Sequence, residues 1–175
     1  MRGPASVAHL AGRFFGSIRP GPPTADDEAW AASHLGPGEL ALWQQMSNPD
    51  RRHAVQVARD VVGALSDGAT DAVIAAALLH DSGKVVSNYR TPMRVVATLV
   101  WSLVDPARAH AWLDAGPPRR RLAEYRLHPE LGADLLAAAD ADDLVVRWAR
   151  EHHRPEDRWT IDPRIGSVLK HCDGD

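Results

Sequence analysis

The stretch Ala75-Ala76-Ala77-Leu78-Leu79-His80-Asp81-Ser82-Gly83-Lys84 joins an apolar, helix-favouring run to a small polar motif. Adjacent His80 and Asp81 at the end of a buried segment can both ligate one metal ion. Gly83 allows the chain to turn sharply, and Lys84 places a positive charge beside whatever the metal binds. One such motif is weak by itself, so its meaning depends on further ligands elsewhere in the chain.

Length and composition are those of a single globular domain. The 175 residues suffice to bury a sizeable core. The hydrophobic content of 45% and the charged content of 25% are typical of soluble proteins. A net charge of −3 gives no overall reason to expect nucleic-acid or anionic-membrane binding.

The cellular setting is inferred from residue usage. Cys172 is the one cysteine, so an intramolecular disulfide is excluded and we expect a cytoplasmic protein. The strong preference for Arg and Ala, with lysine only at Lys84 and Lys170, indicates a GC-rich bacterial genome. The longest apolar run, Val95 to Val104, is shorter than the roughly 20 residues of a membrane span, and we predict a buried helix there.

The sequence predicts an all-α fold, a single domain of about eight to ten helices, because no segment alternates with the strand period. Thr24 and Asn48 are predicted helix N-caps, and residues 85–91 and 154–160 are predicted loops. Helices are expected at residues 24–35, 40–46, 49–65, 71–80, 92–104, 105–114, 119–127, from 128 to the turn at 140–143, 144–153 and from 162 onward.

The N-terminal part is harder to interpret. Residues 1–48 comprise an arm and helices without an assigned role, and residues 49–175 form the predicted metal-binding core. Phe14 and Phe15 are expected to clamp the arm onto the domain. The weaker alternative is a basic, aromatic arm that binds a membrane surface or a partner.

Six candidate ligands lie at or near the apolar sides of separate predicted helices. Any one of these side chains alone is more often a cap or a surface residue. Together they indicate a metal site, because buried imidazoles and carboxylates are costly unless paired or liganded. The set lacks thiolates, which favours catalytic Fe, Mn, Zn or a similar divalent ion over structural zinc. The candidates are His53, His80, Asp81, His128, His152 and Asp173.

The order His53, then His80-Asp81 with Gly83-Lys84, then a distal Asp173 resembles the HD-domain metal-dependent phosphohydrolases over residues 49–173. The resemblance implies an HD-domain helical bundle. It also implies that the first metal is held by His53, His80, Asp81 and Asp173.

The segment His128-Pro129-Glu130-Leu131-Gly132 and the pair His152-His153 resemble the additional histidines of the binuclear branch of that family. This implies that Asp81 bridges two metals and that His128 and His152 hold the second. His153 is a further candidate ligand, or a substrate or outer-sphere contact.

Within that branch the motifs are most similar to those of the HD-GYP cyclic-di-GMP phosphodiesterases, but the chain departs from them. Residues 154–159 contain no Gly-Tyr-Pro, and Pro49 stands where some of them have Glu. The chain also resembles the HD hydrolase that cleaves diadenosine tetraphosphate. A nucleotide substrate is therefore expected, without cyclic-di-GMP specificity.

The expected mechanism uses two divalent metals about 3.5–4 Å apart, whose bridging hydroxide attacks the phosphorus of a phosphoester or phosphoanhydride. Asp81 and Lys84 are the predicted catalytic residues, and Lys84 would neutralise the bound phosphate as a point charge. The further candidates for substrate-binding cations are Arg51, Arg52, Arg126 and Arg154, each of which is equally well explained as a solvated helix-end arginine.

Two alternatives remain at this point. The first is an HD-fold di-iron oxygenase, which uses a similar ligand set; Lys84 favours the phosphate reaction. The second is a non-catalytic regulatory module that binds a nucleotide. Nucleic-acid binding is not expected, since Arg119-Arg120-Arg121 is a short basic patch without an accompanying recognition motif. Substrate, metal and oligomeric state are left open.

Overall fold

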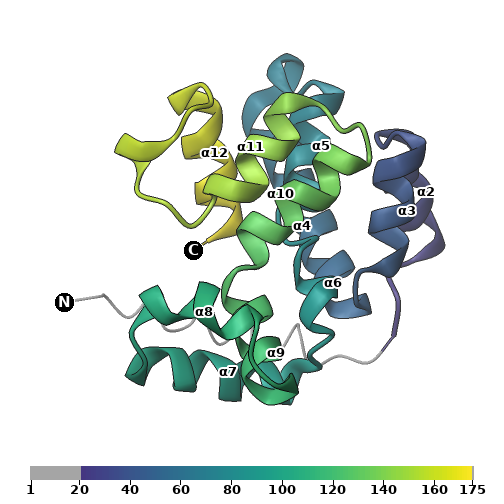
Figure 1. Cartoon of the computed structure of the whole chain (residues 1–175). Helices are drawn as coiled ribbons and strands as arrows, with labels where there is room; N and C mark the ends of the chain where they lie inside the picture. The colour runs from purple at the N-terminus through teal and green to yellow at the C-terminus, as the bar shows by residue number, and fades with distance from the viewer. Residues whose placement is uncertain (1–20, 175) are drawn as a thin grey trace, which may run out of the picture.

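The computed structural model describes residues 21–174, and all regular structure there is helical (Figure 1). Nine of the described α-helices have nine or more residues, which confirms the predicted all-α fold. The α-helices are α2 (Ala25–Ser33), α3 (Pro37–Gln45), α4 (Asn48–Leu65), α5 (Asp71–Leu79), α6 (Lys84–Ser87), α7 (Thr91–Leu103), α8 (Ala109–Leu113), α9 (Pro117–Arg126), α10 (His128–Ala138), α11 (Asp143–Glu151) and α12 (Pro163–Asp173). Short 3-10 turns follow at Ser66–Gly68, Pro106–Arg108 and Glu156–Arg158.

Side-chain caps explain where several helices begin. Thr24 is the N-cap of α2, as predicted: its Oγ1 accepts a hydrogen bond from the backbone N–H of Asp27. The prediction for α4 is wrong by one residue. Ser47 is the cap and accepts from the N–H of Asp50, whereas Asn48 lies inside the first turn and accepts from Arg51. Serine and asparagine are nearly equivalent caps, so the sequence alone does not separate them.

Helix α5 is the centre of the larger part of the molecule. Every residue from Val73 to Leu79 is buried, because α4, α11 and α12 pack around it and α3 closes another side. Helices α2 and α3 join this same core through Ala31, Leu42 and Trp43. We call α2–α5 and α10–α12 the body.

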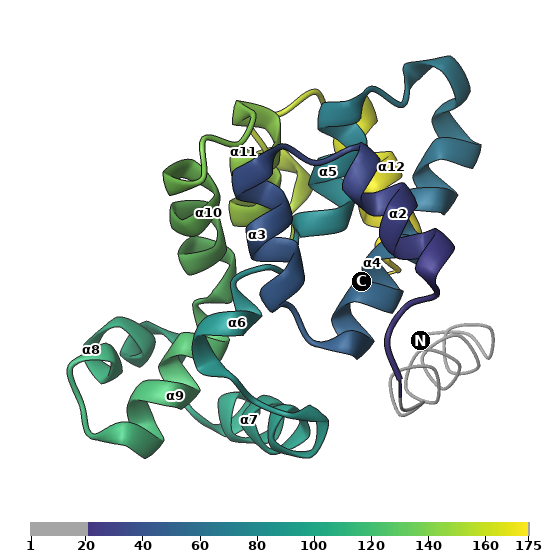
Figure 2. The same ribbon diagram turned by 90° about the vertical axis from the view of Figure 1, so that its right-hand side faces the viewer.

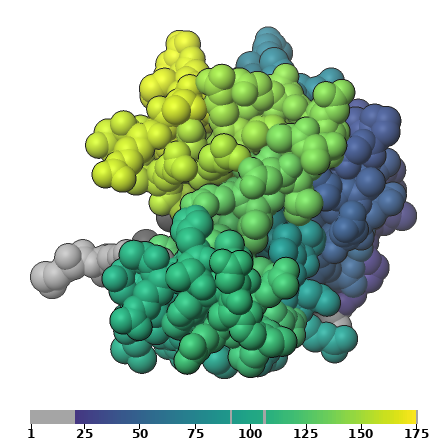
Figure 3. Space-filling model, viewed as in Figure 1, coloured from purple at the N-terminus to yellow at the C-terminus, as the bar shows by residue number. Residues whose placement is uncertain are grey.

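Helices α6 to α9 form a smaller lobe, residues 84–127, between Asp81 and His128 in the sequence. Figures 1 and 2 show α7, α8 and α9 grouped at one end of the molecule, and Figure 3 shows them as a separate mass beneath the body. Trp101 of α7 donates a hydrogen bond to the carbonyl of Leu122 in α9 at 2.9 Å. Arg94 of α7 forms a two-pronged ion pair with Asp50 of α4, which ties the lobe to the body.

Two predictions for this lobe are wrong. Of the predicted loop 85–91, residues 85–87 belong instead to the short helix α6, which ends at Asn88 in the left-handed conformation; residues 88–90 lie outside the helices, as predicted. Helix α7 is not buried: the side chain of Leu99 is 61% exposed and that of Leu103 is 88% exposed. The helix projects from the body, so one face of it lacks a covering element among the described residues.

The predicted clamp of Phe14 and Phe15 lies outside the described residues. No described helix is both long and apolar enough to cross a membrane.

Candidate metal centre

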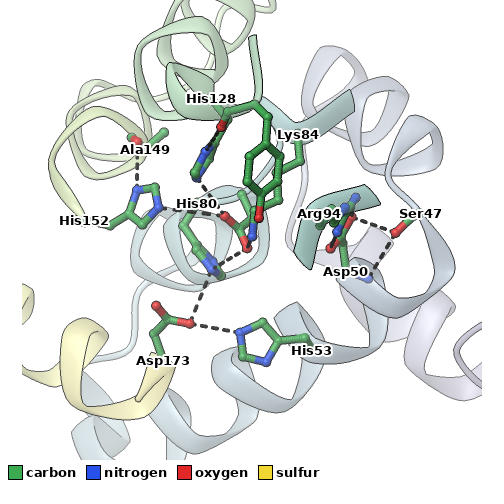
Figure 4. Close-up of polar contacts among 12 residues, drawn as sticks. Ser47, Asp50, His53, His80, Lys84, Arg94, His128, Ala149, His152 and Asp173 are labelled. Atoms are coloured by element: carbon green, nitrogen blue, oxygen red, sulfur yellow. Dashed lines mark hydrogen bonds and ion pairs between the residues drawn. The ribbon is translucent and has the colours of Figure 1, made fainter. Parts of the chain in front are cut away.

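The six predicted ligands come together from five helices of the body, and Figure 4 labels all of them except Asp81. His53 lies within α4 and His128 begins α10. His80, His152 and Asp173 lie at the C-terminal ends of α5, α11 and α12. Because helices that pack side by side bring their ends together, His53 and Asp173 become neighbours although they are 120 positions apart in the sequence.

His53, His80 and Asp173 form the first cluster, with ligand atoms all within 4.8 Å of one another. Oδ1 of Asp173 lies 2.9 Å from Nε2 of His53 and 3.5 Å from Nε2 of His80. The resemblance implied these three residues as first-metal ligands, and the structure places them together.

The second cluster comprises Asp81, His128, His152 and His153, again within 4.8 Å. Oδ1 of Asp81 is 3.3 Å from Nε2 of His128 and 3.8 Å from Nε2 of His152. The ring centroids of His152 and His153 are 4.0 Å apart, and His153 is the exposed member. All three later histidines named from the sequence therefore belong to one group.

Asp81 lies between the two clusters. Its Oδ1 faces His128 and His152, whereas its Oδ2 is 3.4 Å from Nε2 of His80 in the first cluster. A carboxylate with one oxygen toward each group has the geometry that a bridging ligand requires.

Backbone carbonyls fix the orientation of three of the histidines. Nδ1 of His80, His128 and His152 lies 2.8 Å from the carbonyl oxygen of the residue three positions earlier, respectively Ala77, Tyr125 and Ala149. A carbonyl oxygen can only accept, so Nδ1 carries the proton and donates. In the neutral imidazole each Nε2 then keeps a lone pair aimed at the cluster, which is the usual outer-sphere arrangement of metal-binding histidine.

The residues fit a divalent metal. Asp81 Oδ1, His128 Nε2 and His152 Nε2 are buried and make no hydrogen bond within residues 21–174. Leaving such atoms unsatisfied costs free energy, and a cation at this position would satisfy them. Both clusters contain only imidazole and carboxylate, a donor set that suits Fe, Mn or Zn in an open, catalytic type of site.

The two carboxylates of the centre are strongly acidic. Burial alone would raise the pKa of Asp81, but Lys84 and His80 outweigh it and hold the pKa well below its usual value. Burial likewise opposes ionisation of Asp173, whose pKa is lowered by His80 and His53. Both groups are therefore charged and able to ligate a cation throughout the neutral range.

The histidines divide into two electrostatic types. Burial would lower the pKa of His80, but the carboxylates of Asp81 and Asp173 outweigh it and raise the pKa well above its usual value. Burial, followed by the charge of His153, lowers the pKa of His152 well below that value. Although the His153 side chain is partly open to solvent, desolvation by its surroundings and then His128 lower its pKa to about 3. His152 and His153 thus offer neutral imidazoles to the second cluster.

Lys84 forms an ion pair with Oδ2 of Asp81, and its side chain is mostly buried. Burial would lower the pKa of Lys84, but Asp81 and then Asp50 raise it, so the ammonium stays charged. The other predicted cations lie farther out. Arg52 precedes His53 in α4 and donates to the carbonyl of Gly21, whereas Arg126 and Arg154 are exposed.

A contact between Gly83 and Gly132 was not foreseen from the sequence. The chain turns at residues 80–83, as expected, but Gly83 has an ordinary right-handed helical conformation there, so the turn itself does not require glycine. The role of Gly83 is close approach: a Cβ on Gly83 would lie 2.6 Å from the backbone N of Gly132, and one on Gly132 would lie 2.8 Å from the N of Gly83. The sequence did contain a signal for this contact, because a glycine follows the histidine by three or four residues in both motifs.

Comparison with known families agrees with this architecture. Residues 39–173 match the family model of the HD domain. The chain belongs to the HD domain family. HD domains are generally metal-dependent phosphohydrolases, and the matched range includes every candidate ligand described above. No match was found among curated proteins or among solved structures.

Proposed function

We propose that this HD domain is a binuclear metal-dependent phosphohydrolase that cleaves a phosphoester or phosphoanhydride of a small molecule. The observation that carries the proposal is the position of Asp81, with one carboxylate oxygen toward each cluster. His53, His80 and Asp173 would hold one ion, and His128, His152 and the more open His153 would hold the other. When bound, two divalent ions supply an activated water and neutralise developing charge on phosphorus.

The protein's own groups prepare the centre for an anion. Two carboxylates, Asp81 and Asp173, cannot neutralise two divalent ions, and Lys84 adds a further positive charge beside Asp81. The loaded site would therefore be cationic, which complements a phosphate. This charge balance favours hydrolysis of a phosphorylated substrate.

A nucleotide is the proposed substrate class. The ring of Tyr125, partly open to solvent, lies 6.1 Å from that of His128 and 6.1 Å from that of Tyr89. An aromatic face beside the second cluster supports stacking of a base while the phosphate lies on the cations. Arg126, the neighbour of Tyr125, is exposed and available to a second phosphate.

Elemental analysis of the purified protein, followed by a hydrolysis screen, tests the proposal. The screen covers nucleotides, cyclic dinucleotides and generic phosphoesters with Mn, Fe, Co and Ni. We expect close to two equivalents of metal and turnover of a nucleotide. One equivalent would contradict the binuclear site, and oxygen consumption without phosphoester hydrolysis would contradict the hydrolase.

Asp81→Ala provides the matched variant. It should lose metal and activity together, because both clusters lose their shared ligand. Asp134→Ala, an exposed aspartate on α10 paired with Arg150, should change neither. Phosphohydrolase activity retained by Asp81→Ala would refute the assignment of the site.

A further inference from the structure

The outward face of the lobe is an unusual surface. All exposed large hydrophobic side chains within residues 21–174 lie in one short stretch of the chain, on α6 and α7. Large apolar side chains exposed so near one another in the chain are unusual, and exposed apolar surface of this kind marks interaction sites. The residues are Val86, Met93, Val95, Val96, Leu99 and Leu103.

One face of helix α7 is buried and the other is exposed. Ala97 is fully buried and Trp101 packs on α9, so this face belongs to the lobe. Val96, Leu99 and Leu103 follow one another at helical spacing on the outward face and are 45%, 61% and 88% exposed. The outward stripe matches what an amphipathic helix presents to a second apolar helix.

Residues 1–20, which precede the described chain, have a complementary pattern. Their large apolar residues recur at spacings of three, four, one and three, a sequence pattern that would gather them on one side of the segment in a helical conformation. The segment contains Arg2, Arg13 and Arg19 but no acidic residue. The apolar residues are Val7, Leu10, Phe14, Phe15 and Ile18.

The described chain begins close to α7. The carbonyl of Gly21 accepts a hydrogen bond from Arg52 of α4, and Asp50, two residues earlier, pairs with Arg94 in the first turn of α7. Figure 2 shows the first described residues and α7 at the same end of the molecule. Helix α7 has 13 residues, about 20 Å, and a segment of twenty residues spans about 30 Å even when helical. The segment is therefore long enough to cover the stripe.

We propose that residues 1–20 dock their apolar side on the outward stripe of α7 in the same chain. Attachment at Gly21 gives the arm an effective concentration of about millimolar at α7, which favours it over a second copy at ordinary protein concentrations. Docking would remove both apolar surfaces from water together and would place the basic side of the arm outward.

A photo-crosslink tests the position of the arm directly. Leu103→p-benzoylphenylalanine is introduced in the full chain, and the products are mapped by mass spectrometry in a mixture of isotopically light and heavy protein. We expect products with residues 1–20 of the same chain, and none from Gln44→p-benzoylphenylalanine on the exposed side of α3. Light–heavy products would assign the stripe to a second copy, and products without the arm would overturn the proposal.

Hydrogen exchange provides the second measurement. Phe14→Asp in the full chain should accelerate exchange of the α7 amides about tenfold, because a buried aromatic contact is lost, while the α5 amides stay unchanged. Ala5→Asp adds the same charge off the apolar stripe and should leave α7 unchanged. Equal α7 exchange in wild type and Phe14→Asp would overturn the proposal. The proposal would also be overturned if the α7 amides were protected from exchange only after phosphatidylglycerol vesicles are added.

Discussion

Similar apolar sequences are buried in the body and exposed in the lobe. In α5 of the body, Leu78 and Leu79 are fully buried, whereas in α7 of the lobe Leu103 is 88% exposed. Both helices arise from apolar runs that predict a helix equally well. The difference is in the neighbours, because α5 is surrounded by four helices and α7 packs along one face only. An apolar run thus predicts a helix, but its burial depends on the elements that the rest of the chain brings to it.

The largest expected effect is a loss of bound metal when a histidine of the body, but not one of the lobe, is replaced by alanine. His152→Ala should lower the metal content from about two equivalents to one and weaken binding at the second cluster at least about a hundredfold, because a ligand is lost. His53→Ala should do the same at the first cluster. His110→Ala, an exposed lobe histidine paired with Glu130, should keep both metals. Elemental analysis and metal titration measure these outcomes, and a loss of metal in His110→Ala would contradict the assignment.

A pair of leucines tests the contrast in burial. Leu78→Ala in α5 should lower the free energy of unfolding by about 3–4 kcal/mol, since it removes a fully buried side chain and leaves a cavity. Leu103→Ala in α7 should change it by less than about 1 kcal/mol, because the described residues bury little of that side chain and a contact with the docked arm can be lost locally without unfolding the domain. Urea unfolding of both variants measures the difference, and equal losses would refute the distinction.

Two glycines give a similar test of close packing. Gly83→Ala should destabilise the protein by about 2–3 kcal/mol and weaken metal binding at the second cluster, because the new Cβ forces α10 away from the end of α5. Gly63→Ala in α4 meets no atom within 4 Å and should stabilise the helix by up to about 1 kcal/mol. Thermal unfolding combined with metal titration distinguishes the two. A neutral Gly83→Ala would show that the contact can relax.

The smallest effect concerns the ion pair that joins the two regions. Burial would raise the pKa of Asp50, but Arg94 and Lys84 outweigh it and lower the pKa. A lowered folded-state pKa means that the contribution to stability is complete above the unfolded-state pKa of about 4 and is lost as the pH falls through the folded-state value. A double-mutant cycle of Asp50→Ala and Arg94→Ala should give a coupling of about 2 kcal/mol at pH 7.

That coupling should shrink below about pH 4. The exposed pair of Arg147 and Asp143 should give less than about 0.5 kcal/mol at pH 7. A coupling between Asp50 and Arg94 that does not depend on pH would contradict the role of the Asp50 carboxylate.

The sequence predicted the helical body and the group of candidate ligands because the signals are local. A histidine or aspartate at the apolar side or end of a helix is costly in isolation, so His53, His80, His128 and Asp173 were recognisable without knowledge of the packing. Their convergence followed from the expectation that one metal centre accounts for all of them. His153 was named by the resemblance to the binuclear branch and not by this local pattern, and the structure places it in the second cluster.

The remaining features depend on contacts that no local pattern encodes. Ser47 rather than Asn48 is the cap of α4, and the capping preferences of serine and asparagine are too similar for the sequence to decide between them. The exposure of α7 and the ion pair of Lys84 with Asp81 depend on which elements lie nearby. The approach of Gly83 to Gly132 depends on two segments about fifty residues apart meeting through their backbones.

This last contact has a consequence for the precision of the centre. Because Gly83 and Gly132 touch through main-chain atoms, the spacing between the segment that carries Asp81 and the segment that carries His128 is set by van der Waals contact between two backbones. Rotamer changes of nearby side chains do not alter that spacing. The lobe between the two segments can therefore differ in sequence and length while Asp81 and His128 keep the same separation.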